Sequence, residues 1–177
     1  MAIRIKSREV LKVDEEVIKM NSFFVAFRLM WQAKRPKQVL DMRAMACPFW
    51  IKQGYEALTF FGTIITHTQK EAEDINTGPD ELKNHEMIHL YQARSTGNSW
   101  FLFYIRYLWY SLSCLRYSRR LRNSAYLLNP FEMEAYTHMC NRHYLEQCGH
   151  KAEEWRVYAK MTLEQRLRFY KKRLKDV

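Results

Sequence analysis

The sequence predicts an α+β fold that is mostly helical, and three observations support this prediction. One short run is rich in β-branched and aromatic residues, which favour strands. Three longer stretches carry apolar residues at helical spacing. The chain has 177 residues, of which 47% are hydrophobic, and this supplies enough apolar surface for one core. With 5 Gly, 4 Pro and no linker-like segment, residues 1–177 are expected to form a single domain.

The first part of the chain is expected to supply a strand and a loop. Residues 1 to about 53 show no clear helical or strand pattern. The run from Ala57 to Thr66 predicts one strand, with Gly62 as a bulge or a point of close approach. The polar segment from His67 to Asp80 ends this strand and is expected to be a loop.

Helices are expected over most of the remaining chain. The first runs from about Pro79 to Ser95, because acidic residues suit its first turn. A second begins near Ser99 and carries aromatic residues to Leu115 at helical spacing. A third begins at Asn129, which can cap it, and continues to about Gln147. Thr162 and Gln165 form a capping-box pattern ahead of a further helix in the C-terminal region.

The chain is strongly basic, with 29 Lys and Arg against 19 Asp and Glu and a net charge of +10. Two local concentrations of basic residues contribute: Arg116, Arg119, Arg120 and Arg122, and Lys171, Lys172, Arg173 and Lys175. This balance is compatible with nucleic acid, anionic lipid or acidic substrates as partners. Nucleic-acid binding has no recognition motif in its favour, so we interpret most of these charges as solvated helix faces.

The spacing of the cysteines and the hydropathy of the sequence indicate in which cellular compartment the protein is expected. The four cysteines form no CxxC pair, which argues against a zinc ribbon and favours free, buried thiols in a reducing cytosol. Charges near the N-terminus argue against a secretory signal peptide, so a cytoplasmic location is expected. The apolar stretch from Trp100 to Leu115 contains Arg106 and is too short to span a membrane. Its aromatic residues permit a shallow, peripheral membrane contact.

The segment His85-Glu86-Met87-Ile88-His89 combines residue types and spacing that indicate a chemistry. Two histidines four residues apart lie on the same face of a helix and can share one Zn²⁺. A glutamate directly after the first histidine lies beside the open coordination position, where it can accept a proton from water. The motif therefore predicts a zinc-dependent hydrolase.

Two histidines leave the zinc site incomplete, because catalytic zinc normally takes three protein ligands. Six residues elsewhere in the chain are alternatives for the third ligand: His67, His138, His143, His150, Glu132 and Glu134. Histidines in loops are more often exposed than bound to metal, which weakens the case for His67. Glu134 is two positions from Glu132 and points to another face of their helix, so we expect it at the surface or in a salt bridge.

The histidine motif, followed downstream by Asn129-Pro130-Phe131-Glu132 and Ala135, resembles the gluzincin branch of zinc metallopeptidases. In that branch the third ligand is a glutamate on a downstream helix. The downstream segment is similar to the Phe-Glu-x-x-Ala-Asp segment of membrane-associated prenyl-protein proteases and heat-shock proteases. The stretch from Ala57 to Gln92 also resembles small zincin-like domains of bacterial proteins. Together these similarities cover about residues 57–136.

The resemblance implies a compact zincin-like domain with a small β-sheet next to the motif helix and a downstream helix that carries a ligand. Residues 1–53 and 150–177 would then be extensions of the core at residues 57–136. The strand near Phe60 to Thr66 would line the cleft, where an extended peptide could add as an edge strand.

By the same resemblance, three residues would bind zinc: His85, His89 and Glu132. Glu86 would be the general base and acid. The family's aspartate after alanine is replaced by Tyr136, which lies four residues after Glu132 and so faces the same way. Its phenol could take the place of that carboxylate as a hydrogen-bond partner of a histidine. Tyr136 and Tyr91 are also candidates for stabilising the oxyanion.

Two functions follow from these patterns. The first is a zinc metallopeptidase or hydrolase that acts on a peptide or protein substrate. The alternative is a non-catalytic zincin-like interaction domain, with or without metal, that uses a basic and aromatic surface to bind a protein or an anionic partner.

Overall fold

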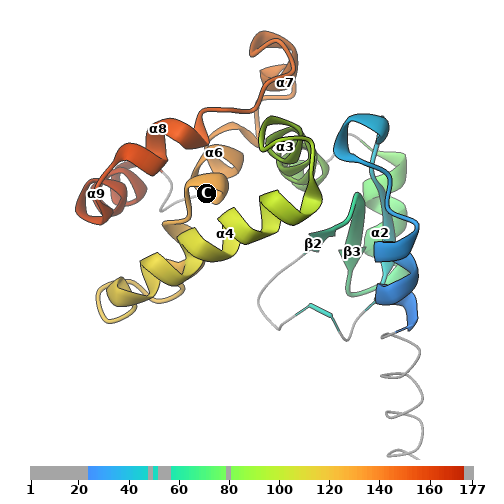
Figure 1. Cartoon of the computed structure of the whole chain (residues 1–177), viewed down its shortest axis with the longest axis horizontal. Coiled ribbons are helices and arrows are strands. Elements are labelled where there is room, and N and C mark those ends of the chain that lie inside the picture. Colours follow the sequence, from blue (N-terminus) through green and yellow to red (C-terminus); the bar gives the residue numbers. More distant parts are fainter. Residues whose placement is uncertain (1–23, 48–49, 52–56, 79–80, 174–177) are drawn as a thin grey trace, which may run out of the picture.

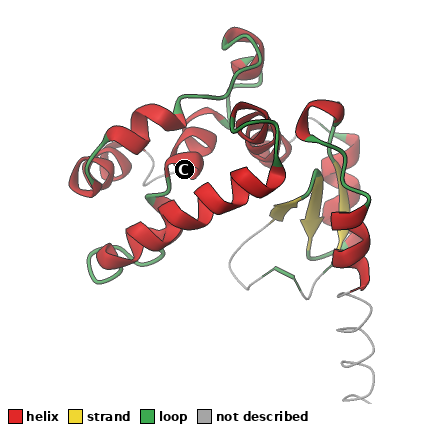
Figure 2. Ribbon diagram, in the orientation of Figure 1, coloured by secondary structure: helices red, strands yellow, loops and turns green. Residues whose placement is uncertain are grey.

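The computed structural model describes residues 24–47, 50–51, 57–78 and 81–173. A three-stranded sheet with a helix on one side lies next to a larger group of helices (Figures 1 and 2). The prediction of an α+β, mostly helical fold is confirmed for these residues. Pro79 and Asp80, where the first helix was expected to begin, lie outside the described residues.

The strands occur in the order β1-β3-β2: β1 is Arg43–Ala46, β2 is Ala57–Phe60 and β3 is Thr63–Thr66. β1 pairs with β3 in parallel, and β2 pairs with β3 antiparallel. The prediction of one strand over residues 57–66 is wrong, because the chain reverses at Phe61 and Gly62, whose φ values are 48° and 86°. Two successive residues with positive φ are typical of a tight hairpin turn. Gly62 is also a point of close approach, since a Cβ there would lie 3.2 Å from the Trp100 ring.

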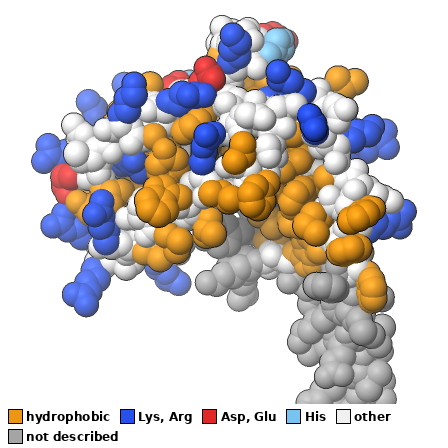
Figure 3. All heavy atoms as spheres, viewed as in Figure 1, with side chains coloured by type: hydrophobic (Ala, Val, Ile, Leu, Met, Phe, Trp, Pro, Cys, Tyr) orange, Lys and Arg blue, Asp and Glu red, His pale blue; other side chains and the backbone are white. Residues whose placement is uncertain are grey.

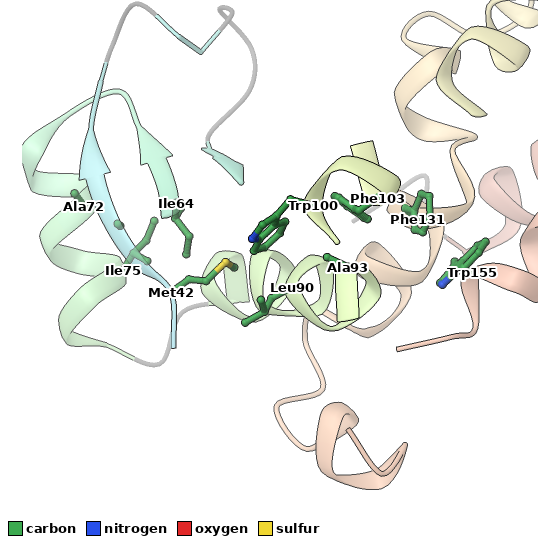
Figure 4. Close-up of a cluster of buried hydrophobic side chains, with 11 residues drawn as sticks. Met42, Ile64, Ala72, Ile75, Leu90, Ala93, Trp100, Phe103, Phe131 and Trp155 are labelled. Carbon is green, nitrogen blue, oxygen red and sulfur yellow. The ribbon is translucent and has the colours of Figure 1, made fainter. Parts of the chain in front are cut away.

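Helix α2, Gln69–Thr77, covers one side of the sheet, so the expected polar loop is also wrong. Thr68 and Glu71 form a capping box that starts this helix. Ala72 and Ile75 are buried against the sheet (Figure 4). A short, mostly polar helix with two buried apolar residues carries little apolar periodicity, which explains why the pattern did not reveal it.

The other described elements are η1 Pro36–Gln38, α3 Glu81–Ser95, α4 Trp100–Cys114, η2 Leu115–Tyr117, α5 Ser124–Leu127, α6 Pro130–His138, α7 Tyr144–Gln147, α8 Trp155–Lys160 and α9 Leu163–Arg173. Residues 24–31 are helical as well. The predicted N-cap of α6 is confirmed, since the Asn129 side chain accepts a backbone hydrogen bond from the first turn. α4 begins next to Ser99 as predicted, and the Ser99 side chain accepts a backbone hydrogen bond from its first turn. The capping box of Thr162 and Gln165 is present too.

The third predicted helix is shorter than expected, because α6 ends at His138 instead of continuing to about Gln147. Asn84 of α3 donates its side-chain amide to the carbonyl oxygens of His138, Met139 and Asn141. A side chain from another helix thus satisfies carbonyl groups that a continuing helix would have used. This contact also ties the end of α6 to the helix that carries the histidine motif.

Aromatic side chains join the sheet to the helices in one core (Figure 4). Phe131 of α6 packs against Phe103 of α4 and Trp155 of α8, with ring centroids 5.1 and 4.6 Å apart. Leu90 of α3 and Trp100 of α4 continue the core toward Ile64 and Met42 at the sheet. The packing holds α3, α4 and α6 in fixed relative positions, and these helices carry most of the candidate site.

All four cysteines are free thiols, but the expectation that they are buried holds in part. Cys47 and Cys114 are buried, whereas Cys140 is exposed at the turn after α6. Among the described residues, no helix combines the length and the apolar character that crossing a bilayer requires.

Candidate metal centre

Helices α3 and α6 bring together His85, His89 and Glu132, a buried group that could hold a metal ion. The histidine Nε2 atoms are 3.1 Å apart. Glu132 Oε2 lies 3.2 Å from His85 Nε2, and Glu132 Oε1 lies 3.4 Å from His89 Nε2. All three side chains are almost fully buried. The i, i+4 spacing on α3 and the Asn129 cap that starts α6 place these donors face to face.

The separations of these donor atoms match the requirements of a small tetrahedral metal site. Ligands at about 2.0–2.1 Å in tetrahedral geometry are about 3.3 Å from each other. The distances of 3.1, 3.2 and 3.4 Å are close to this value; the two that involve Glu132 end at different oxygens of its carboxylate, and one atom from each residue lies within 4.8 Å of the others. Two imidazoles and one carboxylate also form a donor set that suits zinc better than Ca²⁺ or Mg²⁺, which prefer all-oxygen sites.

One buried oxygen in this group supports the fit to a cation. Glu132 Oε2 is buried and makes no hydrogen bond to the described residues. The nearby His85 Nε2, 3.2 Å away, is not aligned for a hydrogen bond, so this buried oxygen carries a desolvation cost that a bound cation would remove. Among the described residues, His85 Nδ1 is the other buried side-chain polar atom that makes no hydrogen bond.

Without metal, the carboxylate and the histidines neutralise each other. Burial disfavours the charged form of His89, but the carboxylates of Glu132 and Glu86 and the hydrogen bond to Gln92 outweigh it and raise the pKa of His89 to about 9. Burial likewise opposes ionisation of Glu132, yet His89 and His85 hold its pKa well below the ordinary range. At neutral pH the metal-free site therefore contains an ion pair, and a metal must displace its proton.

The amide of Gln92 fixes the orientation of His89. Gln92 Nε2 donates to the Phe131 carbonyl oxygen at 2.9 Å and to Glu134 Oε2 at 2.8 Å. Because both amide hydrogens are used, Gln92 Oε1 must accept from His89 Nδ1, 2.7 Å away. A histidine that donates from Nδ1 presents the Nε2 lone pair to a metal.

Glu134 is buried at the centre of this network, so the expectation of a surface residue is wrong. It is 0% exposed. Besides Gln92, it accepts hydrogen bonds from the Tyr144 hydroxyl at 2.6 Å and from the backbone N–H groups of Glu154 and Trp155 at 2.9 and 3.1 Å. It does point away from the metal group, and it supports the site from the far side of α6.

Glu86 lies in the same cavity as the metal group and is held by the sheet. Its carboxylate is buried and accepts a hydrogen bond from the Thr59 hydroxyl of β2. On the opposite side, the Tyr107 hydroxyl of α4 donates to Glu132 Oε1 at 2.6 Å. Each carboxylate of the site is thus oriented by a hydroxyl group from a different element.

A cavity of about 420 Å³ opens onto these groups. Its lining is largely apolar and aromatic: Trp50, Ile51, Ala57, Leu58, Phe103, Tyr104, Tyr107 and Tyr126 accompany His85, Glu86, His89 and Glu132. The cavity is lined by β2, so the expectation that residues 60–66 line it is wrong. The reason is the hairpin, which places β3 in the middle of the sheet and β2 at its edge.

Tyr136 contacts the site mainly through its ring. The ring packs edge-on against His85, with centroids 4.6 Å apart, and its hydroxyl lies 2.9 Å from the Tyr126 hydroxyl. Tyr126, from α5, lines the cavity, which the sequence did not indicate. Burial, together with Glu132 and Tyr136, raises its pKa far above the ordinary value. Tyr126 therefore keeps its proton and can act as a hydrogen-bond donor.

The other histidines considered as a third ligand, and Tyr91, which was considered for the oxyanion, do not belong to the metal group. Tyr91 stacks on His150, with ring centroids 5.8 Å apart, and lines a different surface depression. His138 lies 2.7 Å from the carboxylate of Glu154, and the exposed His143 lies 3.1 Å from that of Glu146. His67 is not part of the described group that could hold a metal.

Four residues of the site were missed from the sequence: Thr59, Gln92, Tyr107 and Tyr126. Gln92 had a usable signal, because it lies three residues after His89 and so shares its helix face. The others reach the site through contacts between elements distant in sequence, which periodicity does not reveal.

Comparisons with protein-family models, with curated protein sequences and with solved structures find no match to this chain. The function must therefore be inferred from the chemistry of the site itself.

Proposed function

We propose that this protein is a zinc-dependent hydrolase that cleaves peptide bonds. The observation that carries the proposal is the arrangement of His85, His89 and Glu132, whose donor atoms lie within 4.8 Å of one another, with the carboxylate of Glu86 in the same cavity. Three protein ligands leave one coordination position for water or substrate, as in catalytic zinc sites.

When bound, zinc supplies Lewis-acid chemistry, which polarises the substrate carbonyl and acidifies a water molecule in the cavity. Glu86 accepts the proton of this water and later delivers it to the departing amine. Its hydrogen bond from Thr59 orients the carboxylate for both steps. Gln92 keeps His89 in the tautomer that can bind the metal.

Tyr126 is the group we assign to the developing oxyanion. It lines the cavity, keeps its proton and is positioned by the Tyr136 hydroxyl. A preorganised donor that faces the charge formed in the transition state accelerates acyl transfer. Tyr136 then acts through Tyr126 and through its ring contact with His85.

The walls of the cavity favour an extended substrate with an apolar side chain. β2 is one of the two edge strands of the described sheet, so a peptide could pair with it next to Glu86. The aromatic rings of Phe103, Tyr104 and Tyr107 would then surround a large apolar residue of the substrate.

The test is the Glu86→Gln variant, assayed on a broad peptide library with mass-spectrometric detection. We expect hydrolysis to fall by about 10²- to 10⁴-fold, while about one zinc per chain remains bound. Glu81→Gln, the same change at an exposed position of α3, is the matched control and should retain full activity. Full zinc occupancy without turnover by the natural chain would contradict the proposal and favour a non-catalytic interaction domain.

A further inference from the structure

Helix α4 is apolar on its outer face as well as on its inner face. The inner face buries Trp100 and Phe103 in the core. The outer face exposes a row of large apolar residues: Phe101, Leu102, Ile105, Leu108, Trp109 and Leu112, continued by Leu115 in η2. Their spacing of three and four residues places them in one continuous stripe. We call these seven residues the α4 stripe, and Figure 3 shows hydrophobic side chains gathered along it.

A second exposed apolar group lies at the start of α4. Phe27, Met30 and Trp31 of the helix over residues 24–31 are exposed, and the rings of Phe27 and Trp31 stack with centroids 5.9 Å apart. Met30 and Phe101 line the same surface depression. The two groups therefore lie on either side of one depression, and together they expose more apolar side chains than the isolated residues of an ordinary surface.

The sequence segments that form this surface are basic and contain no acidic residue, although Glu164 of α9 pairs with Arg120 at 2.8 Å. No Asp or Glu occurs in the sequence between Glu86 and Glu132, an interval that contains Arg94, Arg106, Arg116, Arg119, Arg120 and Arg122. Residues 24–40 also lack acidic residues and contain Arg28, Lys34, Arg35 and Lys37. Arg106 borders the α4 stripe, one helical turn from Leu102. Figure 3 shows Lys and Arg side chains around the apolar band.

We propose that the α4 stripe binds the surface of an anionic lipid bilayer. An exposed apolar helix face with a basic border is the pattern of helices that lie in the plane of a membrane interface. The 15-residue length of α4 suits this position, because it is too short to span the bilayer. The apolar side chains would enter the interface, and the arginines would contact lipid phosphates.

Charge favours a bilayer over a second copy of the chain. Each copy carries a net charge of +10, and the basic borders of two stripes would face each other in a dimer. An anionic bilayer instead complements both the apolar residues and the positive border.

The experiment is vesicle flotation of the full chain, with phosphatidylcholine vesicles that contain phosphatidylserine and with vesicles of phosphatidylcholine alone. We expect flotation with the anionic vesicles, weakened at least tenfold without phosphatidylserine and reduced by salt. Trp109→Ser should weaken binding about tenfold. Arg119→Glu should weaken it about fivefold or more, because its charge is reversed near the lipid headgroups.

A matched pair provides the control. Leu108 is 57% exposed on the α4 stripe and Val157 is 55% exposed on α8. Leu108→Ser should weaken flotation several-fold, whereas Val157→Ser should leave it unchanged, with equal thermal stability in both variants. Glu86→Gln should bind vesicles like the natural chain, so the bilayer proposal and the hydrolase proposal can fail independently.

Three results would overturn the bilayer proposal. The first is no flotation with anionic vesicles, and the second is flotation that Trp109→Ser and Leu108→Ser leave unchanged. The third is sedimentation of the lipid-free chain as a dimer that Trp109→Ser dissociates, which would assign the stripe to a second copy.

Discussion

Helix α3 buries polar side chains, whereas helix α4 exposes apolar ones, and both are contrary to the usual distribution of residues in a protein. α3 buries His85, Glu86, His89 and Gln92, side chains that usually face water. α4 has the same length of 15 residues, yet its outer face exposes Phe101, Trp109 and five other large apolar residues including Leu115 at its end. Each departure costs stability unless something else compensates it.

The compensation differs between the two regions. In α3 it lies inside the molecule, where Glu132, Glu134 and Thr59 provide hydrogen-bond and charge partners for the buried polar groups. For the outer face of α4, the described residues provide no cover. The comparison supports the two proposals, a metal centre inside the molecule at α3 and a membrane-binding surface outside it at α4, and the inner face of α4 forms a wall of the cavity between them.

The largest expected effect is loss of the metal when a ligand is removed. His89→Ala should abolish stoichiometric zinc binding, because two ligands do not hold zinc tightly. Elemental analysis after purification measures this. His143→Ala removes an exposed histidine and should leave the zinc content unchanged. Equal zinc content in both variants would place the metal elsewhere.

The two faces of α4 should respond very differently to truncation. Phe103 is 2% exposed and Phe101 is 69% exposed. Phe103→Ala should lower the free energy of unfolding by about 3–5 kcal/mol, since it leaves a cavity among Phe131, Trp100 and Tyr107. Phe101→Ala should change it by about 0.5 kcal/mol or less. Urea titration measures both, and similar losses would show that the outer face is covered in solution.

The hydrogen bond between Gln92 and His89 should strengthen zinc binding. Gln92→Ala should weaken zinc binding by about 10- to 100-fold, because His89 loses the partner that fixes its tautomer. Competition with a zinc-binding dye measures the affinity, and circular dichroism checks that the variant is folded. Gln147→Ala, at an exposed position, is the control. Unchanged affinity in a folded Gln92→Ala protein would show that Gln92 does not position His89.

Zinc affinity should depend on pH in a direction set by His89. Its pKa in the metal-free protein is raised to about 9, so at neutral pH it is protonated and must lose that proton to bind metal. Affinity should therefore rise about tenfold per pH unit from neutral pH and level off above about 9. Calorimetry in buffers of different ionisation enthalpy should detect about one released proton. Binding without proton release would contradict the ion pair of His89 and Glu132.

The parts of the site that depend on local periodicity could be predicted from the sequence. Helical spacing places His85 and His89 on one face, and the Asn129 cap starts the helix that carries Glu132. The burial of Glu134 was predicted wrongly, because the argument from helical spacing assumes that one face of a helix is exposed to solvent. Residues 130–135 of α6 are all buried, so a position that points away from the site is buried as well.

The parts that depend on distant contacts could not be predicted. Thr59 and Tyr126 reach the cavity from β2 and α5, and no spacing rule connects them to the histidine motif. The hairpin was missed because residues 57–66 form a continuous run of strand-favouring residues apart from Gly62, and Phe61 is an uncommon residue at positive φ. That turn decides which strand lines the cavity.

A crystal structure of the zinc-loaded protein, with anomalous diffraction recorded at the zinc edge, locates the metal itself. The expected result is one zinc with His85 Nε2, His89 Nε2 and a Glu132 oxygen within about 2.0–2.2 Å. A zinc held by other residues, with Glu132 still paired with His89, would show that these three side chains are not the metal centre.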